Sequence, residues 1–289
     1  QAEDGIRDLV RSRGLGDVYK RQQMVMDELG IVSNIVVTES TRYWVVEDLF
    51  PAGRPPFENA EGVIMESTYK DVKKYEDMKL RILNMCHSLI AGLGVLLGYR
   101  GQYGISRAMQ DADLRRVMDR IIDIVIATID HPSKMRPRDF AKDTILRLNN
   151  PNIPDDPMRI AFNASAKMLP RFLDTYYAGQ AKGMSSDALD IVLLPVAGFL
   201  RYTLGVDDAG RSHELADDPI RETLVACGQK ATLGDTGSAV AFEALVADTG
   251  VMGKNLLEHG DTGKRLLAMV GAMLAGPGAV RKAVQAHRQ

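Results

Sequence analysis

The sequence predicts a mainly α-helical protein with a short extended element near its N-terminus. β-branched and aromatic residues gather into short runs only before residue 70. From Tyr75 onward, apolar residues recur at the three- and four-residue spacing of a helix that buries one face. Turns rich in proline and glycine separate these helical stretches. We find no internal repeat, so a multihelical body is the simplest architecture for this pattern.

The extended element rests on three runs. Residues 35–39 (IVVTE) and 43–46 (YWVV) are rich in residues that favour strands, and residues 62–66 are a third candidate. Between them, residues 50–56 (FPAGRPP) form a loop by their proline and glycine content.

The helices follow in order. We expect the first two at 75–97 and 111–129. Asp155 or Asp156 can cap the next helix, whose first turn holds Pro157. Pro170 is expected to kink or restart the chain, and Pro195 interrupts an apolar run. The later helices are expected at residues 157–168, 186–204, 219–230, 238–248, 262–274 and 279–287.

Composition narrows the class of protein. The chain has 289 residues, 45% hydrophobic and 26% charged, with a formal net charge of −2. This balance gives no bias toward nucleic acid or anionic membranes. No apolar run reaches the ~18 residues of a membrane span. Cys86 and Cys227 sit in apolar helical patterns and read as buried free thiols, so we expect a cytoplasmic protein without zinc.

The sequence lacks a nucleotide-binding signature. No GxGxxG motif follows a strand, and the glycines of GLGVLLG (92–98) fall inside an expected helix, where they serve packing. The GPGAV stretch (276–280) is expected to be a turn between helices.

Polar residues share one side of the helix expected at 75–97. With 100° per residue, Glu76, Lys79, Asn84 and His87 lie within one arc of about 140°. Met78, Ile82, Met85, Leu89 and Leu96 form a separate apolar stripe.

This set suits the oxidation of an alcohol. Partial burial lowers the pKa of a lysine toward neutrality, so Lys79 can accept a hydroxyl proton, and Glu76 can relay it to water. Asn84 can donate a hydrogen bond to the developing alkoxide, and a neutral His87 can donate a second one. The alternative is structural: Lys79 extends to solvent, Asn84 caps nearby backbone and His87 is a satisfied core histidine.

A second polar set lies near residue 160. Arg159, Asn163 and Lys167 are four residues apart, which places them on one face of a continuous helix. Two cations there could hold a polyhydroxyl or carboxylate substrate. An ordinary solvated basic face is the alternative.

Four separated segments resemble one enzyme family. The lysine, asparagine and histidine of KYEDMKLRILNMCHS (74–88) resemble the signature helix of the long-chain mannitol dehydrogenase family. TESTRYWVVEDLF (38–50), RLNNPNIPDDPMRIAFNASAKMLPRF (147–172) and GVDDAGRSHELADDP (205–219) are similar to three further family segments, in the same order. The first of these departs from the family at 40–41, where Ser-Thr stands in place of Pro-Phe.

The resemblance implies an NAD- or NADP-dependent oxidoreductase of polyols or sugar acids, such as fructuronate or tagaturonate reductases. It implies a multihelical C-terminal domain, similar to that of 6-phosphogluconate dehydrogenase, preceded in the family by a Rossmann domain. Lys79 would be the catalytic base, with Glu76 relaying its proton. Arg159 and Lys167 would bind substrate. The family's additional Rossmann-domain asparagine has no match here.

The first 22 residues fit poorly with the rest. They resemble the translation of a sequencing adapter, which implies an assembly artefact that cut off the Rossmann half; a polar N-terminal arm is the alternative. We therefore expect residues 23–70 to be an interdomain remnant and 71–289 the helical substrate domain. The competing interpretation of the whole chain is a catalytically silent helical fragment or an interaction module. Its oligomeric state is not predicted.

Overall fold

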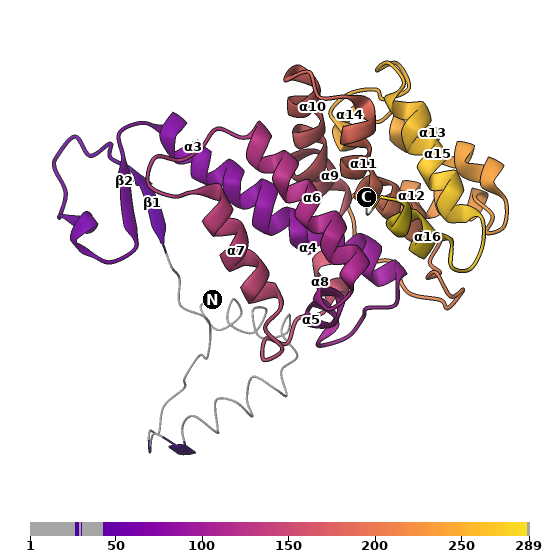
Figure 1. The fold of residues 1–289 in the computed structure, drawn as a ribbon, viewed down its shortest axis with the longest axis horizontal. Helices are drawn as coiled ribbons and strands as arrows, with labels where there is room; N and C mark the ends of the chain where they lie inside the picture. Colours follow the sequence, from indigo (N-terminus) through magenta and orange to yellow (C-terminus); the bar gives the residue numbers. More distant parts are fainter. Residues whose placement is uncertain (1–26, 29, 31–42, 288–289) are drawn as a thin grey trace.

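The protein is a helical body with a pair of strands at one end (Figure 1). The structure, a computed structural model, describes residues 27, 28, 30 and 43–287. The mainly α prediction is confirmed. The strand expected at 35–39 and the segment 1–22 lie outside the described residues.

The two strands are β1 (Trp44–Glu47) and β2 (Val63–Glu66), joined through the 3₁₀ turn η1 (Phe57–Asn59). They pair in parallel, with Trp44 opposite Val63 and Glu47 opposite Glu66. The carboxylate of Glu66 accepts hydrogen bonds from Tyr75 Oη at 2.7 Å and from Ser133 Oγ at 3.0 Å, which tie the strands to the helical body.

One long helix forms the spine of the fold. It consists of α3 (Tyr69–Met78), the wider π-helical segment η2 (Lys79–Asn84), α4 (Met85–Leu89) and a second π-helical segment η3 (Ile90–Gly94). It begins six residues before the expected start, because Thr68 caps it by accepting the backbone N–H of Asp71.

The remaining helices pack around this spine. They are α5 (Gly104–Met109), α6 (Ala112–Thr128), α7 (Pro137–Leu148), α8 (Pro157–Ala161), α9 (Ser165–Met168), the π-helical η4 (Leu169–Leu173), α10 (Asp174–Ala181), α11 (Ser186–Tyr202), α12 (Arg221–Lys230), the 3₁₀ segment η5 (Thr236–Phe242), α13 (Glu243–Val246), α14 (Thr249–Met252), α15 (Thr262–Leu274) and α16 (Ala279–Ala286). Four of these α-helices, α5, α7, α10 and α14, lie outside the predicted ranges.

Acidic side chains begin several helices. Asp111 accepts the N–H groups of residues 113 and 114 at the start of α6, and Asp156 accepts that of Met158 at the start of α8. The cap predicted before Pro157 is thus confirmed at Asp156. Pro170 lies in the π-helical η4, whereas Pro195 is buried inside an uninterrupted α11.

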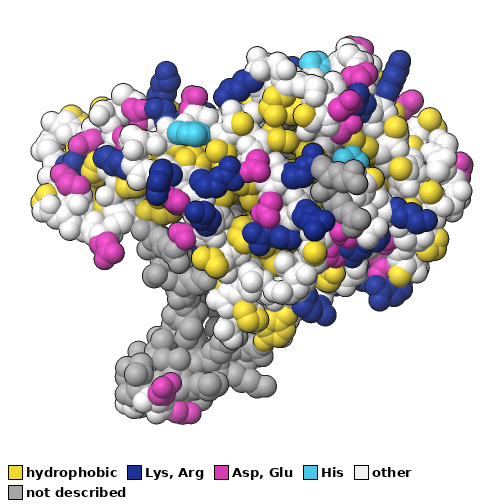
Figure 2. Space-filling view, in the orientation of Figure 1, with side chains coloured by type: hydrophobic (Ala, Val, Ile, Leu, Met, Phe, Trp, Pro, Cys, Tyr) yellow, Lys and Arg dark blue, Asp and Glu magenta, His cyan; other side chains and the backbone are white. Residues whose placement is uncertain are grey.

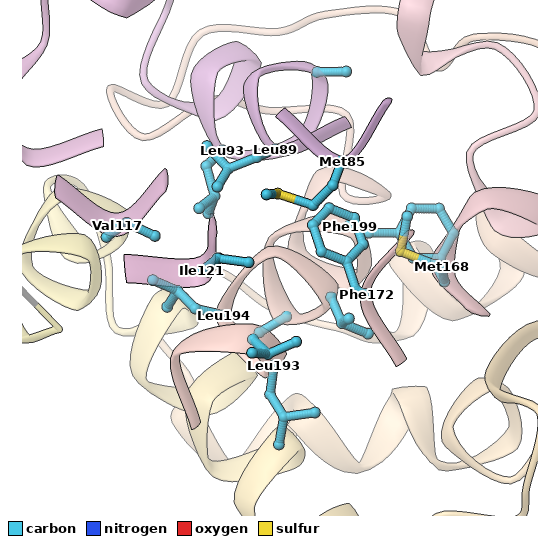
Figure 3. Packing of buried hydrophobic residues seen from close by; sticks show 14 of the residues in the cluster. Met85, Leu89, Leu93, Val117, Ile121, Met168, Phe172, Leu193, Leu194 and Phe199 are labelled. Carbon is cyan, nitrogen blue, oxygen red and sulfur yellow. The ribbon is translucent and has the colours of Figure 1, made fainter. Parts of the chain in front are cut away.

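The core lies where the spine crosses α6 and α11. Figure 3 shows side chains from all three helices meeting there: Met85, Leu89 and Leu93 from the spine, Val117 and Ile121 from α6, and Leu193, Leu194 and Phe199 from α11. The predicted apolar stripe is confirmed, because its five members are all 0% exposed. Cys86 and Cys227 are buried free thiols, as expected.

One close crossing gives a stability prediction. A Cβ at Gly228 of α12 would lie 2.2 Å from the carbonyl oxygen of Thr203 at the end of α11, and backbone cannot move aside. Gly228→Ala should therefore lower the free energy of unfolding by about 1–3 kcal/mol in urea denaturation. Gly92→Ala is the control, since its Cβ would meet nothing closer than 3.8 Å, and should be neutral or stabilising. Equal losses in both variants would contradict this account.

The surface carries both signs of charge. Over the face in Figure 2, Lys and Arg side chains are interspersed with Asp and Glu, as the net charge of −2 suggests. None of the helices in the described part of the chain has the length and apolar character needed to cross a membrane.

Candidate functional site

The four polar residues predicted on the spine fall around its first π-helical segment. Lys79 opens η2 and Asn84 closes it, with Glu76 one turn before and His87 one turn after. A π turn inserts an extra residue into a helix and is frequent at functional sites. The sequence analysis placed these residues with 100° per residue throughout. The inserted residue therefore changes the angle about the helix axis between Lys79 and His87.

Glu76 and Lys79 are exposed. Neither side chain makes a hydrogen bond or ion pair among residues 43–287. The partial burial expected of a base is therefore not provided by the described part of the chain. A ligand or another surface covering Lys79 would have to supply it. Both side chains are free to meet such a partner.

His87 has a defined orientation. Its Nδ1–H donates to the carbonyl oxygen of Leu83 at 3.0 Å. Since a carbonyl only accepts, Nε2 of the neutral ring is left as an acceptor. Burial lowers the pKa of His87, and the nearby cations Arg159 and Arg171 lower it further, which keeps the ring neutral. The geometry favours accepting a hydrogen bond, whereas the sequence suggested donating one.

The prediction that Arg159, Asn163 and Lys167 share one helix face is wrong. The helix expected at 157–168 breaks after Ala161, and Asn163 adopts a left-handed φ of 53°. The backbone N–H of Asn163 instead donates to the carbonyl oxygen of Asp217 at 2.8 Å. Asparagine tolerates this conformation better than most residues, which explains where the helix stops.

The break nevertheless brings the two cations close. The ammonium of Lys167 turns back and donates to the carbonyl oxygens of Ile160, at 2.7 Å, and of Phe162, at the C-terminal end of α8. Arg159 lies on the same short helix, where Asp155 accepts from its Nε at 2.8 Å and its Nη2 at 2.7 Å. Cations at a helix C-terminus are favoured by the partial negative charge there.

Lys167 has a shifted pKa. Burial is the largest cause, and together with the positive charges of Arg171 and Arg159 it lowers the pKa of this ammonium to about 8. Asp218 acts against them. Its carboxylate holds the start of α9 by accepting from Ser165 N at 2.9 Å and Ser165 Oγ at 2.5 Å.

Arg171 is a site residue that the sequence analysis missed. Its Nη1 donates to Ser88 Oγ at 2.7 Å and to the carbonyl oxygen of Asn84 at 3.1 Å. These hydrogen bonds join η4 to the part of the spine that carries Asn84 and His87. The four-residue spacing from Lys167 to Arg171 was a signal that could have identified it.

A small cavity adjoins this cluster. It has a volume of about 20 Å³, enough for one water molecule. Ser88 of the spine, Lys167 and Tyr202 contribute its polar groups, and alanine, glycine and apolar side chains complete the wall. Among residues 27, 28, 30 and 43–287, no group of three His, Cys, Asp or Glu side chains could hold a metal ion.

The structure thus gathers some of the predicted site residues into one cluster and places two others away from it. Arg159, Lys167 and Arg171 gather beside His87, and Asn84 joins them through its backbone. Glu76 and Lys79 lie farther along the spine.

Comparisons with known proteins agree on one family. The family model of the mannitol dehydrogenase C-terminal domain matches residues 71–249. D-mannonate oxidoreductase of Thermotoga maritima is 33% identical over 258 residues, covering 88% of this chain and 47% of that protein. Mannitol 2-dehydrogenase of Aspergillus oryzae is 35% identical over 216 residues, 74% of this chain and 41% of that protein.

A solved structure has the same fold. The ternary complex of Pseudomonas fluorescens mannitol 2-dehydrogenase with NAD and D-mannitol aligns with a TM-score of 0.70 at 24% identity, covering 84% of this chain and 46% of that one. This chain spans about half the length, or less, of the curated relatives it matches.

Proposed function

The chain belongs to the mannitol dehydrogenase family through that family's C-terminal domain, and from this premise we propose that it carries the substrate-binding and proton-transfer groups of an NAD(P)-dependent oxidoreductase. The reaction interconverts a secondary alcohol of a polyol or sugar acid and the corresponding ketone. The relatives named for mannonate and mannitol support this substrate class. The observation that carries the proposal is the cluster of His87, Arg159, Lys167 and Arg171 beside the helix that bears Lys79.

The nicotinamide cofactor is proposed to bind mainly to an N-terminal Rossmann domain outside this chain. The described residues contain two short strands and no glycine-rich turn from a strand into a helix, so they do not form a pyrophosphate cradle. The cofactor supplies the hydride acceptor. The residues of this chain are assigned to the substrate and its proton.

Each polar residue of the spine has a proposed role. Lys79 takes the proton of the reacting hydroxyl, and Glu76 passes it to solvent. The side-chain amide of Asn84 donates to the oxygen as it becomes a ketone. His87 accepts, through Nε2, a hydrogen bond from a neighbouring substrate hydroxyl. Its fixed Nδ1–H and neutral ring support this assignment.

Arg159 and Lys167 are proposed to hold the rest of the substrate. Arg159 is kept in place by Asp155, and Lys167 by the end of α8. Both keep N–H groups for a substrate, because neither set of hydrogen bonds uses every donor of its side chain.

The function is tested by turnover of the complete gene product. NADH and NADPH oxidation should be followed with fructuronate, tagaturonate and fructose, and NAD(P)+ reduction with mannonate, mannitol and arabinitol. Turnover with at least one of these is expected. No turnover with any of them, together with no binding of the dinucleotide, would leave the alternative of a silent helical module.

Substrate affinity should depend on pH through Lys167. Below about pH 8 its ammonium is charged, and above it the charge is lost, while Arg159, Arg171 and Asp218 keep theirs. KM should therefore rise roughly threefold to tenfold between pH 7 and pH 9.5, as charged hydrogen bonds become neutral ones. Lys167→Arg keeps its charge and should flatten the profile of KM. An unchanged rise in that variant would assign the titration to another group.

A further inference from the structure

Arg171 has unused hydrogen-bonding capacity at the centre of the cluster. One nitrogen, Nη1, is fixed by Ser88 and by the carbonyl oxygen of Asn84. Its Nε–H and Nη2–H groups have no partner among the described residues. Ser88 is next to His87 on the spine, so the anchored guanidinium lies within the proposed substrate site.

The charge of Arg171 is also uncompensated. Three arginines of the described chain are buried enough that their pKa falls: Arg81, Arg171 and Arg201. Asp174 and Asp77 stabilise the charge of the first, and Asp208 and Asp207 that of the last. No carboxylate does so for Arg171, for which burial is the sole cause of the shift. A half-buried cation without a counter-ion is costly unless a ligand supplies one.

The surrounding charges do not supply this counter-ion. Asp155 is engaged in both of its contacts with Arg159. Asp218 is engaged at the start of α9 and influences Lys167. Asp156 also acts on Arg159 and is engaged at the start of α8. Each of these carboxylates is thus bound elsewhere, and none of them acts on Arg171.

We propose that Arg171 binds the carboxylate of the substrate and that the site therefore takes sugar acids, aldonates or their keto forms, in preference to neutral polyols. This inference rests on the proposed function and narrows its substrate class. The free Nε–H and Nη2–H lie on one edge of a planar guanidinium, which matches the two oxygens of a carboxylate. Ser88 acts as a positioning residue, because it holds the opposite side of the guanidinium.

The test compares an acid and a neutral substrate of the same backbone, fructuronate and fructose, in the complete gene product. The wild type should have a kcat/KM at least tenfold higher for the acid. Arg171→Gln should lower kcat/KM for the acid by roughly 10- to 100-fold, mostly through KM, and change that for the neutral substrate less than threefold. Arg171→Lys should recover part of the loss. The control, Arg138→Gln, removes an exposed arginine paired with Asp123 and should change neither substrate.

Each outcome decides the matter. A wild type that prefers fructose, or equal losses on both substrates in Arg171→Gln, would overturn the carboxylate assignment while leaving the proposed function intact. Absence of turnover with either substrate would instead count against the proposed function. Should Arg171→Gln fail to fold, inhibition of the wild type decides: gluconate must inhibit at least tenfold more strongly than sorbitol, and equal inhibition contradicts the inference.

Discussion

Replacing Lys79 by alanine should lower kcat by about 10²- to 10⁴-fold, the usual contribution of a positioned general base. KM should change little, because the proposed substrate contacts are made by the cluster around Arg159 and Lys167 and not by Lys79. The measurement is steady-state turnover of the complete gene product with its best substrate. The large effect follows from position: Lys79 opens the π-helical segment, is exposed, and has no competing partner among the described residues.

Two comparisons make the Lys79 prediction specific. Added primary amines should restore part of the activity of Lys79→Ala, since a small amine can occupy the vacated space and take the proton. Lys70→Ala removes an exposed lysine of the same helix, well before the π turn, and should leave kcat within twofold of the wild type. Equal losses in Lys70→Ala and Lys79→Ala, or a Lys79 variant with full activity, would remove Lys79 from the reaction.

Local sequence rules predicted the helices that have a capping residue or a regular apolar stripe. The cap at Asp156, the apolar stripe of the spine and the helix Thr262–Leu274 were all correct. The parallel pairing of β1 with β2 could not be predicted, because it depends on a register between segments that the chain pattern does not specify.

The site was harder to predict because it depends on departures from regular helix. No residue type predicts a π turn, so the side chains of Lys79 and His87 were placed at the angles of a regular α-helix. The break at Asn163 was missed because asparagine also fits helix interiors at modest cost. Arg171 was missed because its role depends on Ser88, which is 83 positions away in sequence. For Asn163 and Arg171, a contact with a distant part of the chain decided what the local pattern left open.

The largest effect on stability is expected at Arg201. This arginine of α11 is 0% exposed, and it donates to the carbonyl oxygens of Val206 at 2.9 Å and Met273 at 3.2 Å. It thereby joins the ends of α11 and α15 to the turn at 205–212. Arg201→Met keeps most of the volume but leaves these buried carbonyl oxygens without their donor, whereas the Asp207 carboxylate keeps Arg100 and Arg211. We expect a loss of about 3–5 kcal/mol in the free energy of unfolding, measured by urea denaturation, because each buried acceptor left unsatisfied costs about 1–3 kcal/mol.

Matched variants separate charge from hydrogen bonding at this position. Arg138→Met removes an exposed ion pair with Asp123, whose side chain is 58% exposed, and should cost under about 1 kcal/mol. Arg201→Lys restores a cation but not the planar guanidinium with its several N–H donors. If Arg201→Lys regains most of the stability, attraction between the cation and the nearby carboxylates is the main contribution. If Arg201→Lys is as unstable as Arg201→Met, the hydrogen bonds from the guanidinium to the carbonyl oxygens are the main contribution. A loss in Arg201→Met no larger than that in Arg138→Met would show that water replaces the buried guanidinium, and that the three segments hold together by packing alone.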